Sequence, residues 1–348
     1  MTAASVRPGS PIEAPAPPSL VDPRSERPRF GTYRGALGSF DLSSLRGARE
    51  LFREKRWIYV ILTKAPWTMA LAVVDLGYAQ TTFGFAAHQE RGLVADLRSV
   101  PGMPGVSRVR QDGVHRLDAR LVGPRTSVRV RERRGEAVLE VRASTPSLEL
   151  RASLDLASAA PAMTAIAPIR GGVVDATEKR SLAPVRGAAL VAGERVDLDG
   201  GLGGFDVTVG LLARETQWNW AFLQGAATTG EPIALNLVQG FVGAPECALF
   251  GRDSVHALSE GRFELPAGPG SPRDRAKRLE PWQIRTAEGE VDLRFEPFAV
   301  HDEGLDLGLV RSRFVQPIGT FSGTIRRGET LLRLERVPGV VEDQDVRW

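Results

Sequence analysis

The sequence repeats itself, and this duplication constrains the fold more than any other feature of the chain. Residues 35–42 read GALGSFDL and residues 200–207 read GGLGGFDV, so five of the eight positions are identical. The pattern Arg-Glu-x-x-Trp-x-Tyr/Trp-x-x-Leu then begins at Arg53 and begins again at Arg214. Ordered matches at a nearly constant offset predict two copies of one structural unit, joined head to tail.

The length of the chain, 348 residues, also fits two domains. Residues 1–29 contain seven prolines and almost no large apolar side chains, so we predict a disordered or loosely draped segment there. The repeat places the first unit at residues 30–165 and the second at residues 166–348. The stretch 157–177, rich in Ala, Gly and Pro, is the expected junction.

Alternation of apolar and polar residues with a period of two dominates both halves of the chain. Residues 147–156 alternate leucine or alanine with polar partners, and residues 290–295 and 330–336 do the same. This pattern is typical of antiparallel strands with one buried face, and glycines and prolines separate the runs at turn positions. We therefore predict an all-β fold made of two lipocalin-like antiparallel β-barrels or strongly curved sheets.

The composition argues against several classes of protein. A net charge of +3, with basic and acidic residues intermixed, is too small for a nucleic-acid-binding surface. No apolar stretch reaches membrane-spanning length, and residues 1–29 lack the apolar region of a secretion signal. Cys247 is the only cysteine, which excludes an intrachain disulfide and fits a reducing compartment. We therefore expect a soluble, cytoplasmic protein.

The second copy contains a predicted β-hairpin that holds the only two asparagines of the chain, Asn219 and Asn236. If the loop at residues 225–230 is symmetric, the two asparagines lie opposite each other on neighbouring strands. Trp218 and Trp220 then share one apolar face, and Asn219 lies on the other, polar face. In a barrel one of these faces lines the interior, and a register slip of one residue would exchange them.

The hairpin has two interpretations. In the first, the tryptophans pack in the core or at the barrel rim, and the asparagines satisfy buried backbone groups. In the second, a polar cluster in a cavity orients a ligand or moves a proton. For the second interpretation, the candidate ligand-binding residues are Arg214, Trp218, Asn219, Trp220 and Asn236, and the candidate catalytic residues are Glu215, Glu246 and Asp75.

Two of the candidate acids also have a structural interpretation. Asp75 ends an apolar strand and is expected to cap the following turn. Glu246 lies in an apolar run and, if it is buried, needs an ion-pair partner such as Arg214.

The two copies differ in polarity at this hairpin. The first copy has Ile58 in place of Asn219, and at the shared offset it has Asp75 in place of Asn236. Positions that both copies keep are explained as scaffold. We therefore expect a functional site in the second copy.

The residues of metal and cofactor sites do not form a recognisable pattern. The histidines are scattered, and none has the spacing of a zinc motif. The sequence has no nucleophile elbow, phosphate loop or dinucleotide-binding glycine pattern. We expect no metal and no cofactor, and we expect Cys247 to be an unreactive core thiol.

Several blocks of the sequence form a pattern that is recognisable as a whole. They are Arg53–Trp57, Asp75–Tyr78, Thr177–Lys179, Arg214–Trp220, Asn236–Leu237, Glu246 and Arg347–Trp348. The pattern resembles the bacterial and fungal family called domain of unknown function 2804, and the likeness covers nearly everything after residue 29. In its tandem, calycin-like architecture the chain is more distantly similar to lipocalin-like carotenoid hydratases of the hydroxyneurosporene synthase type.

These observations support three hypotheses about function. In the first, the protein binds a small hydrophobic molecule, isoprenoid- or lipid-like, in a barrel cavity. In the second, it is a cofactor-independent hydratase, isomerase or cyclase for such a molecule, with Glu215 or Glu246 as proton donor. In the third, its barrels are filled and it has a structural or protein-interaction role.

Overall fold

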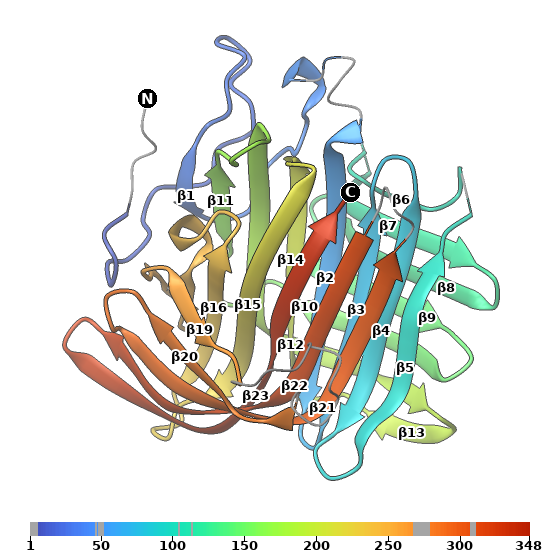
Figure 1. The fold of residues 1–348 in the computed structure, drawn as a ribbon, viewed down its shortest axis with the longest axis vertical. Helices are drawn as coiled ribbons and strands as arrows, with labels where there is room; N and C mark the ends of the chain where they lie inside the picture. Colours follow the sequence, from blue (N-terminus) through green and yellow to red (C-terminus); the bar gives the residue numbers. More distant parts are fainter. Residues whose placement is uncertain are drawn as a thin grey trace.

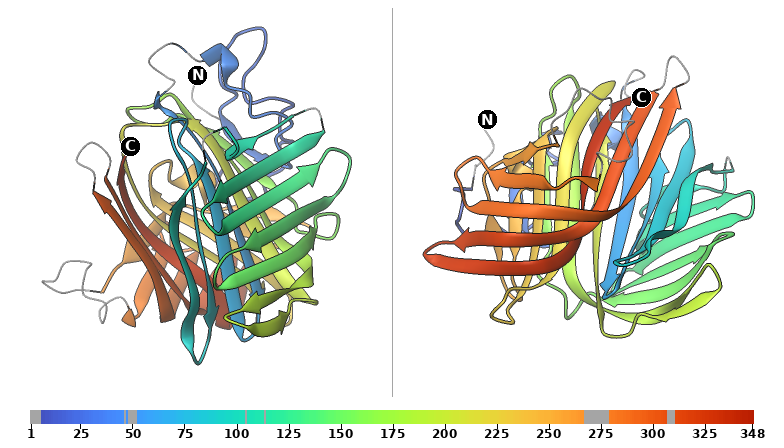
Figure 2. Two further views of the ribbon diagram at one scale, coloured as in Figure 1. Left: turned by 90° about the vertical axis from the view of Figure 1, so that its right-hand side faces the viewer. Right: turned by 60° about the horizontal axis from the view of Figure 1, so that its bottom comes forward.

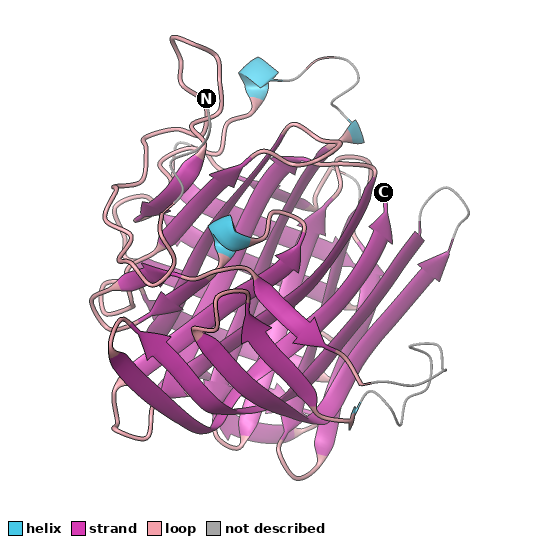
Figure 3. Cartoon of the chain, turned by 60° about the vertical axis from the view of Figure 1, so that its left-hand side comes forward, coloured by secondary structure: helices cyan, strands magenta, loops and turns pink. Residues whose placement is uncertain are grey.

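A computed structural model describes residues 6–45, 47, 52–103, 105–112, 114–266, 279–306 and 311–348. Within these residues the chain is almost entirely β-strand, with two short 3-10 helices, η1 (Ser43–Leu45) and η3 (Ala244–Glu246) (Figure 3). No helix among the described residues has the length and apolar character needed to cross a membrane.

The strands are β1 (Gly31–Arg34), β2 (Glu54–Lys64), β3 (Trp67–Asp75), β4 (Gln80–His88), β5 (Gly92–Pro101), β6 (Arg108–Arg110), β7 (His115–Gly123), β8 (Thr126–Arg133), β9 (Val138–Ser144), β10 (Leu148–Asp155), β11 (Met163–Ala167), β12 (Val174–Val191), β13 (Glu194–Asp197), β14 (Gly201–Leu211), β15 (Glu215–Ala226), β16 (Pro232–Gly240), β17 (Ala248–Phe250), β18 (Val255–Ala257), β19 (Gly261–Glu264), β20 (Trp282–Thr286), β21 (Val291–Asp306), β22 (Arg311–Arg327) and β23 (Thr330–Arg347).

The strands form two antiparallel sheets (Figure 1). The first has fourteen strands in the order β5-β4-β3-β2-β14-β12-β10-β9-β8-β7-β6, with β11 and β13 paired to β12 and β1 paired to β11. The second has nine strands in the order β18-β17-β16-β15-β23-β22-β21-β20-β19. We call the strands β2–β14 unit 1 and the strands β15–β23 unit 2.

Both units have the same topology. In each unit the first long strand pairs with the last one, β2 with β14 and β15 with β23. Both sheets curl, because β6 and β7 pack against β3 in unit 1 and β19 packs against β16 in unit 2. The predicted all-β fold, a tandem duplication of a lipocalin-like curved sheet, is confirmed.

The chain passes from the first sheet to the second between Leu211 and Glu215. The unit boundary that we predict from the sequence lies at residue 165. The division at residue 165 stays a prediction. The described part of the proline-rich segment packs against residues of both sheets. It buries Ile12 and Leu20 and pairs with β18 through the backbone of Gly9.

Each curved sheet buries an apolar cluster on its concave face. On β2, Ile58, Val60 and Leu62 face the interior of unit 1, while Tyr59 and Ile61 face unit 2. Strands that are buried on both faces read as continuous apolar runs, and β2 shows this pattern from residue 57 to residue 62. Figure 2 shows the two units side by side, with the orange and red strands of unit 2 against the blue strands of unit 1.

Candidate functional site

Matching residues of the two copies meet at the interface between the units. Trp57 of β2 stacks on Trp218 of β15, with ring centroids 6.4 Å apart and ring planes at 9°. Two residues further along each strand, Tyr59 meets Trp220 edge-on at 5.4 Å. These are the aromatic positions of the repeated pattern, so the units contact each other through equivalent surfaces, as two-fold-related subunits do.

A carboxylate lies beside the inner aromatic residue of each unit. Asp206 of β14 is the register partner of Tyr59, and Glu342 of β23 is the register partner of Trp220. Because β14 and β23 are the closing strands of the two units, Asp206 and Glu342 occupy equivalent positions.

Asp206 belongs to a charged cluster. The Lys179 ammonium, on β12, forms ion pairs with Asp206 and with Glu246, whose Oε2 lies 3.1 Å away. Burial lowers the pKa of Lys179, but attraction to Asp206 and Glu246 outweighs this effect and raises that pKa overall. Asp175 contacts Glu246, and burial raises the pKa of both carboxyls, that of Asp175 well above its usual value. Burial therefore favours the protonated form of this carboxyl pair.

Glu342 belongs to a neutral, hydrogen-bonded cluster. Its Oε1 accepts a hydrogen bond from Trp218 Nε1 at 2.7 Å, and its Oε2 lies 3.0 Å from Gln316 Nε2 on β22. The amide oxygen of Gln316 accepts a hydrogen bond from the Tyr59 hydroxyl at 3.0 Å. Burial raises the pKa of Glu342 to about 8, so this carboxyl is mostly protonated at neutral pH. If the Gln316 amide flips, its oxygen accepts a hydrogen bond from protonated Glu342 and its N–H donates to the Tyr59 oxygen. The cluster can therefore satisfy both the protonated and the ionised form of Glu342.

A small cavity lies at the interface beside these clusters. Its volume is about 10 Å³, roughly the space for one water molecule. It is lined by Tyr59, Ile61, Lys179, Phe205, Asp206, Trp220, Phe222 and Asn236. Trp220 Nε1 donates to Asn236 Oδ1 at 2.7 Å, and Asn236 Nδ2 donates to the backbone carbonyl of Glu246 at 2.7 Å. Asn236 therefore fixes the Trp220 ring relative to η3.

The polar interface continues to His301, a fully buried side chain on β21. Its Nδ1 lies 2.6 Å from Asp96 Oδ1 on β5, so this contact also joins the two units. Its Nε2 is buried without a hydrogen-bond partner and lies 3.6 Å from Glu303 Oε1. His301 is the register partner of Gln316, which places it next to the Glu342 cluster.

The register of the hairpin differs from our prediction. Ala226 pairs with Pro232, so the loop comprises residues 227–231 and Asn219 lies opposite Gln239 rather than Asn236. The shift is an odd number of residues and therefore exchanges the faces of the second strand. As a result Asn236 faces Trp220, whereas Asn219 lies on the other side of the sheet and donates to Asp343 Oδ1 at 3.3 Å.

The remaining candidates do not line this interface cavity. Glu215 is exposed and pairs with Arg347 at 3.5 Å. Arg214 is exposed, and the cation beside Glu246 is Lys179 rather than Arg214. Asp75 Oδ1 accepts the backbone N–H of Gly77 at 3.0 Å, which is the turn-capping role considered above.

Sequence reasoning missed Asp206, Lys179 and Glu342. The composition contained a signal for Lys179, because only four of the 45 basic residues are lysines. Among the described residues, Lys55 and Lys179 are buried. The rarity argument that singled out the asparagines applies equally to these lysines. Asp206 lies in the repeated Gly-x-Leu-Gly-x-Phe-Asp block, whose first copy instead caps η1 with Asp41.

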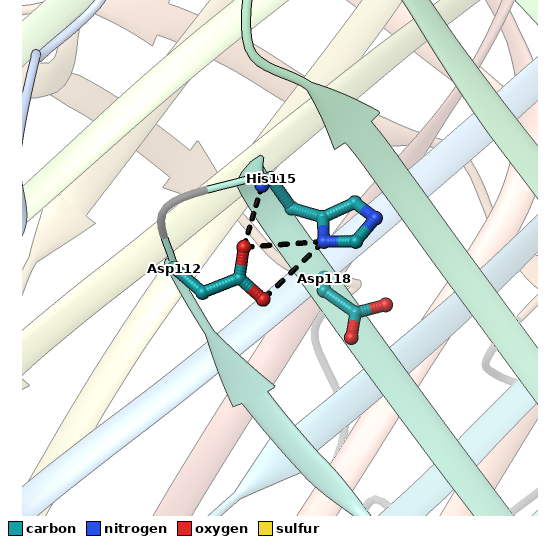
Figure 4. A group of neighbouring side chains, drawn as sticks. All are labelled: Asp112, His115 and Asp118. Carbon is teal, nitrogen blue, oxygen red and sulfur yellow. Dashed lines mark hydrogen bonds and ion pairs between the residues drawn. The ribbon is translucent and has the colours of Figure 1, made fainter.

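One group of possible metal ligands occurs among the described residues: Asp112, His115 and Asp118 (Figure 4). Their ligand atoms lie within 4.8 Å of one another. However, Arg129 Nε lies 3.0 Å from Asp118, and Arg110 lies 3.3 Å from Asp112. Because the two guanidinium groups already neutralise the two carboxylates, we assign no metal to this group.

A larger cavity opens at one end of unit 1, on the concave side of its sheet. Its volume is about 560 Å³, within the range of small-molecule sites. We call it the mouth cavity, and it is lined by Phe52, Glu54, Arg56, Asp75, Gly77, Tyr78, Gln80, Val109, Arg110 and Gln111.

The family model that matches the chain is described as Domain of unknown function (DUF2804), and it covers residues 11–348. This match confirms the resemblance inferred from the sequence blocks. No curated protein matches the chain.

Solved structures with the same fold share little sequence with this chain. A crystal structure of CghA with Sch210972 has a TM-score of 0.53 at 13% identity, covering 84% of this chain and 88% of that one. An AttH-like protein from Nitrosomonas europaea has a TM-score of 0.54 at 12% identity, covering 88% and 96%. Kievitone hydratase from Nectria haematococca has a TM-score of 0.53 at 12% identity, covering 83% and 88%. At these identities the likeness establishes the fold alone.

Proposed function

The chain belongs to the DUF2804 family, whose description states no function, and we propose one from the geometry of the interface. The protein is a cofactor-independent acid–base enzyme that acts on a small, hydrophobic, unsaturated molecule between its two units. The observation that supports this proposal is the pair of equivalent carboxyl groups, Asp206 and Glu342, which have opposite environments.

The two environments suit an acid and a base. Glu342 has a pKa of about 8 because of burial, so it can donate a proton at neutral pH. Asp206 forms an ion pair with the Lys179 ammonium and lines the interface cavity, so we assign it as the proton acceptor. Two carboxyl groups in unlike surroundings are a recurring arrangement in acid–base enzymes.

The proposed reaction is hydration or isomerisation of a carbon–carbon double bond. The Glu342 proton passes to one alkene carbon, the π electrons form the new C–H bond, and a carbocation remains on the other carbon. In hydration, a water oxygen then bonds to that carbon and loses a proton to Asp206. In isomerisation, a neighbouring C–H bond loses its proton to Asp206 and its electrons form the new double bond. The faces of Tyr59 and Trp220 would stabilise the cation.

Access to this site requires the interface to open. The cavity holds about one water molecule. The half-buried Trp57–Trp218 stack lies two residues along the same strands from Tyr59 and Trp220, which line the cavity. Trp218 also donates to Glu342, so a movement of this indole would uncover the carboxyl group. We assign the Trp57–Trp218 pair as the gate through which substrate enters.

The test uses the purified full chain and a panel of small unsaturated isoprenoids and polyketides in ¹⁸O- and deuterium-labelled water. Mass spectrometry should detect a product that has gained one labelled water or exchanged one hydrogen. Glu342→Gln and Asp206→Asn should each lower the rate by about 100-fold or more. Glu215→Gln is the matched control, because Glu215 is exposed and distant from the cavity, and it should leave the rate unchanged.

Two results would contradict the proposal. Turnover that survives both Glu342→Gln and Asp206→Asn would place the chemistry elsewhere. The absence of any product or label exchange, in a screen where a known hydratase is active on its own substrate, would leave binding as the function.

A second candidate, supported by the mouth cavity, is a binding or carrier function for a small hydrophobic molecule. The mouth cavity is far larger than the interface cavity, and Tyr78 and Val109 form an apolar part of its wall. Native mass spectrometry and organic extraction of the purified protein test this candidate, which predicts a co-purified small molecule. If Tyr78→Ala leaves the content of such a molecule unchanged, the mouth cavity is not its site.

A further inference from the structure

We propose that the mouth cavity of unit 1 binds a small amphipathic carboxylic acid. The inference rests on the second candidate function and adds the chemistry of the ligand. It follows from an imbalance between the hydrogen-bond donors and acceptors of the cavity wall.

The acidic groups of the wall already have partners. Glu54 Oε1 accepts from Arg56 Nε at 2.7 Å. Asp75 Oδ1 accepts from the backbone N–H of Gly77 and from Gln80 Nε2, each at 3.0 Å. These carboxylates are therefore engaged in holding the wall together, and their pairing reduces repulsion of an anionic ligand.

Two donors of the wall, in contrast, are buried and lack an acceptor: Gln111 Nε2 and Arg110 Nε. Gln111 Oε1 accepts the backbone N–H of Phe40 at 2.9 Å, which fixes the amide so that its N–H groups point away from Phe40. Arg110 Nε lies 3.8 Å from Asp118 Oδ2, too far for a hydrogen bond. Buried donors without acceptors are unfavourable, and a carboxylate offers both oxygens that this pair of neighbours needs.

The rest of the wall can contact a ligand that has an apolar part and a negatively charged head group. Val109 is buried, and the exposed side chains of Tyr78 and Phe52 stand at the rim. The Lys55 ammonium lies 5.0 Å from the centre of the Tyr78 ring, on a side chain that is itself buried. The Lys55 ammonium, which donates to the backbone carbonyls of Phe52 and Glu54, supplies a positive charge that favours a negatively charged head group.

The experiment measures binding of octanoate to the full chain by calorimetry and ligand-observed NMR, with 1-octanol and octylamine as matched ligands. We expect octanoate to bind at least about tenfold more tightly than octanol. Gln111→Glu retains the acceptor for Phe40 but replaces the free donor with a carboxylate, so it should abolish octanoate binding and spare octanol binding. Gln283→Leu, at a half-exposed glutamine in unit 2, is the control and should change neither.

Each outcome decides between the proposals. Equal affinity for octanoate and octanol, or unchanged octanoate binding in a folded Gln111→Glu variant, would overturn carboxylate recognition while leaving a hydrophobic binding site. If none of the three ligands binds at millimolar concentration, both this inference and the carrier candidate are wrong. Gln111→Leu, with folding checked by circular dichroism, distinguishes loss of the donor from charge repulsion and should weaken octanoate binding about tenfold.

Discussion

Asp206 in unit 1 and Glu342 in unit 2 occupy equivalent positions, but their neighbours differ. The strand next to Asp206 supplies a lysine, Lys179, whereas the strand next to Glu342 supplies an uncharged glutamine, Gln316. The first carboxyl is therefore part of an ion pair, and the second has a pKa raised by burial. Divergence of the strands beside two duplicated carboxyl groups therefore gives the two groups different surroundings, which the proposed acid and base roles require.

The same comparison explains why the interface is more informative than either concave face. Apolar clusters occupy much of the two concave faces and stabilise the fold. The interface contains side chains from both units, and a duplicated chain can change one copy while the other retains its packing. A pair of unequal carboxyl groups can arise there from substitutions such as Lys179 against Gln316.

The largest expected effect comes from removal of the cation in unit 1. Lys179→Met leaves Asp206 and Glu246 buried without a counter-charge, and we expect a loss of about 3–5 kcal/mol in the free energy of unfolding. Gln316→Met at the equivalent place in unit 2 removes only hydrogen bonds and should cost about 1–3 kcal/mol. Urea denaturation at pH 7 measures both, and equal losses would contradict the proposed difference between the two clusters.

The next effect is the pH dependence that Glu342 contributes to stability. The folded state keeps the Glu342 proton up to a pKa of about 8, whereas the unfolded state loses it near 4.5. The contribution to stability is therefore complete below pH 4.5 and is lost as the pH rises to about 8, by a few kcal/mol. Glu342→Gln should flatten the curve of unfolding free energy against pH in this window. A variant curve parallel to that of the wild type would show that Glu342 is ionised in the native state.

A smaller effect is expected at the aromatic contacts that join the units. A double-mutant cycle with Trp57→Leu and Trp218→Leu should give a coupling energy of about 0.5–1.5 kcal/mol for the stacked pair. Trp218→Leu also removes a hydrogen bond that lowers the pKa of Glu342, so the single variant should raise that pKa further. A second double-mutant cycle, with Tyr59→Leu and Trp220→Leu, measures the other aromatic contact of the interface for comparison. A coupling energy of zero between Trp57 and Trp218 would contradict the proposal that this pair forms the gate.

The fold could be predicted from the sequence because its signals are local or periodic. The period-two alternation predicted antiparallel strands, and the repeated blocks at Arg53 and Arg214, which fall at the starts of β2 and β15, predicted the duplication. The register of the β15–β16 hairpin could not be predicted in the same way. Its five-residue loop is asymmetric about the centre that we assumed, and a shift of three residues moved Asn236 to the other face.

The site could be predicted only in part, because it is assembled from strands that are distant in sequence. Trp218, Trp220, Asn236 and Glu246 lie in or beside the interface clusters, and all come from β15, β16 and η3. Their charged partners come from β12, β14 and β23, which reach the same place only through the closing of each sheet. No spacing in the sequence relates Lys179 to Glu246, so the partner we predicted was Arg214, a residue nearer in sequence.

The smallest effect is expected at Glu215, which belongs to the repeated Arg-Glu-x-x-Trp pattern but lies at the exposed start of β15. Its partner Arg347 is 3.5 Å away, and its side chain is 72% exposed, so water and salt screen the pair. Glu215→Gln should change the free energy of unfolding by less than about 0.5 kcal/mol at pH 7. The same denaturation series used for Glu342→Gln measures this variant. A pH-dependent loss comparable to that of Glu342→Gln would mean that the repeated glutamate, rather than the closing-strand carboxyl, is the titrating group of unit 2.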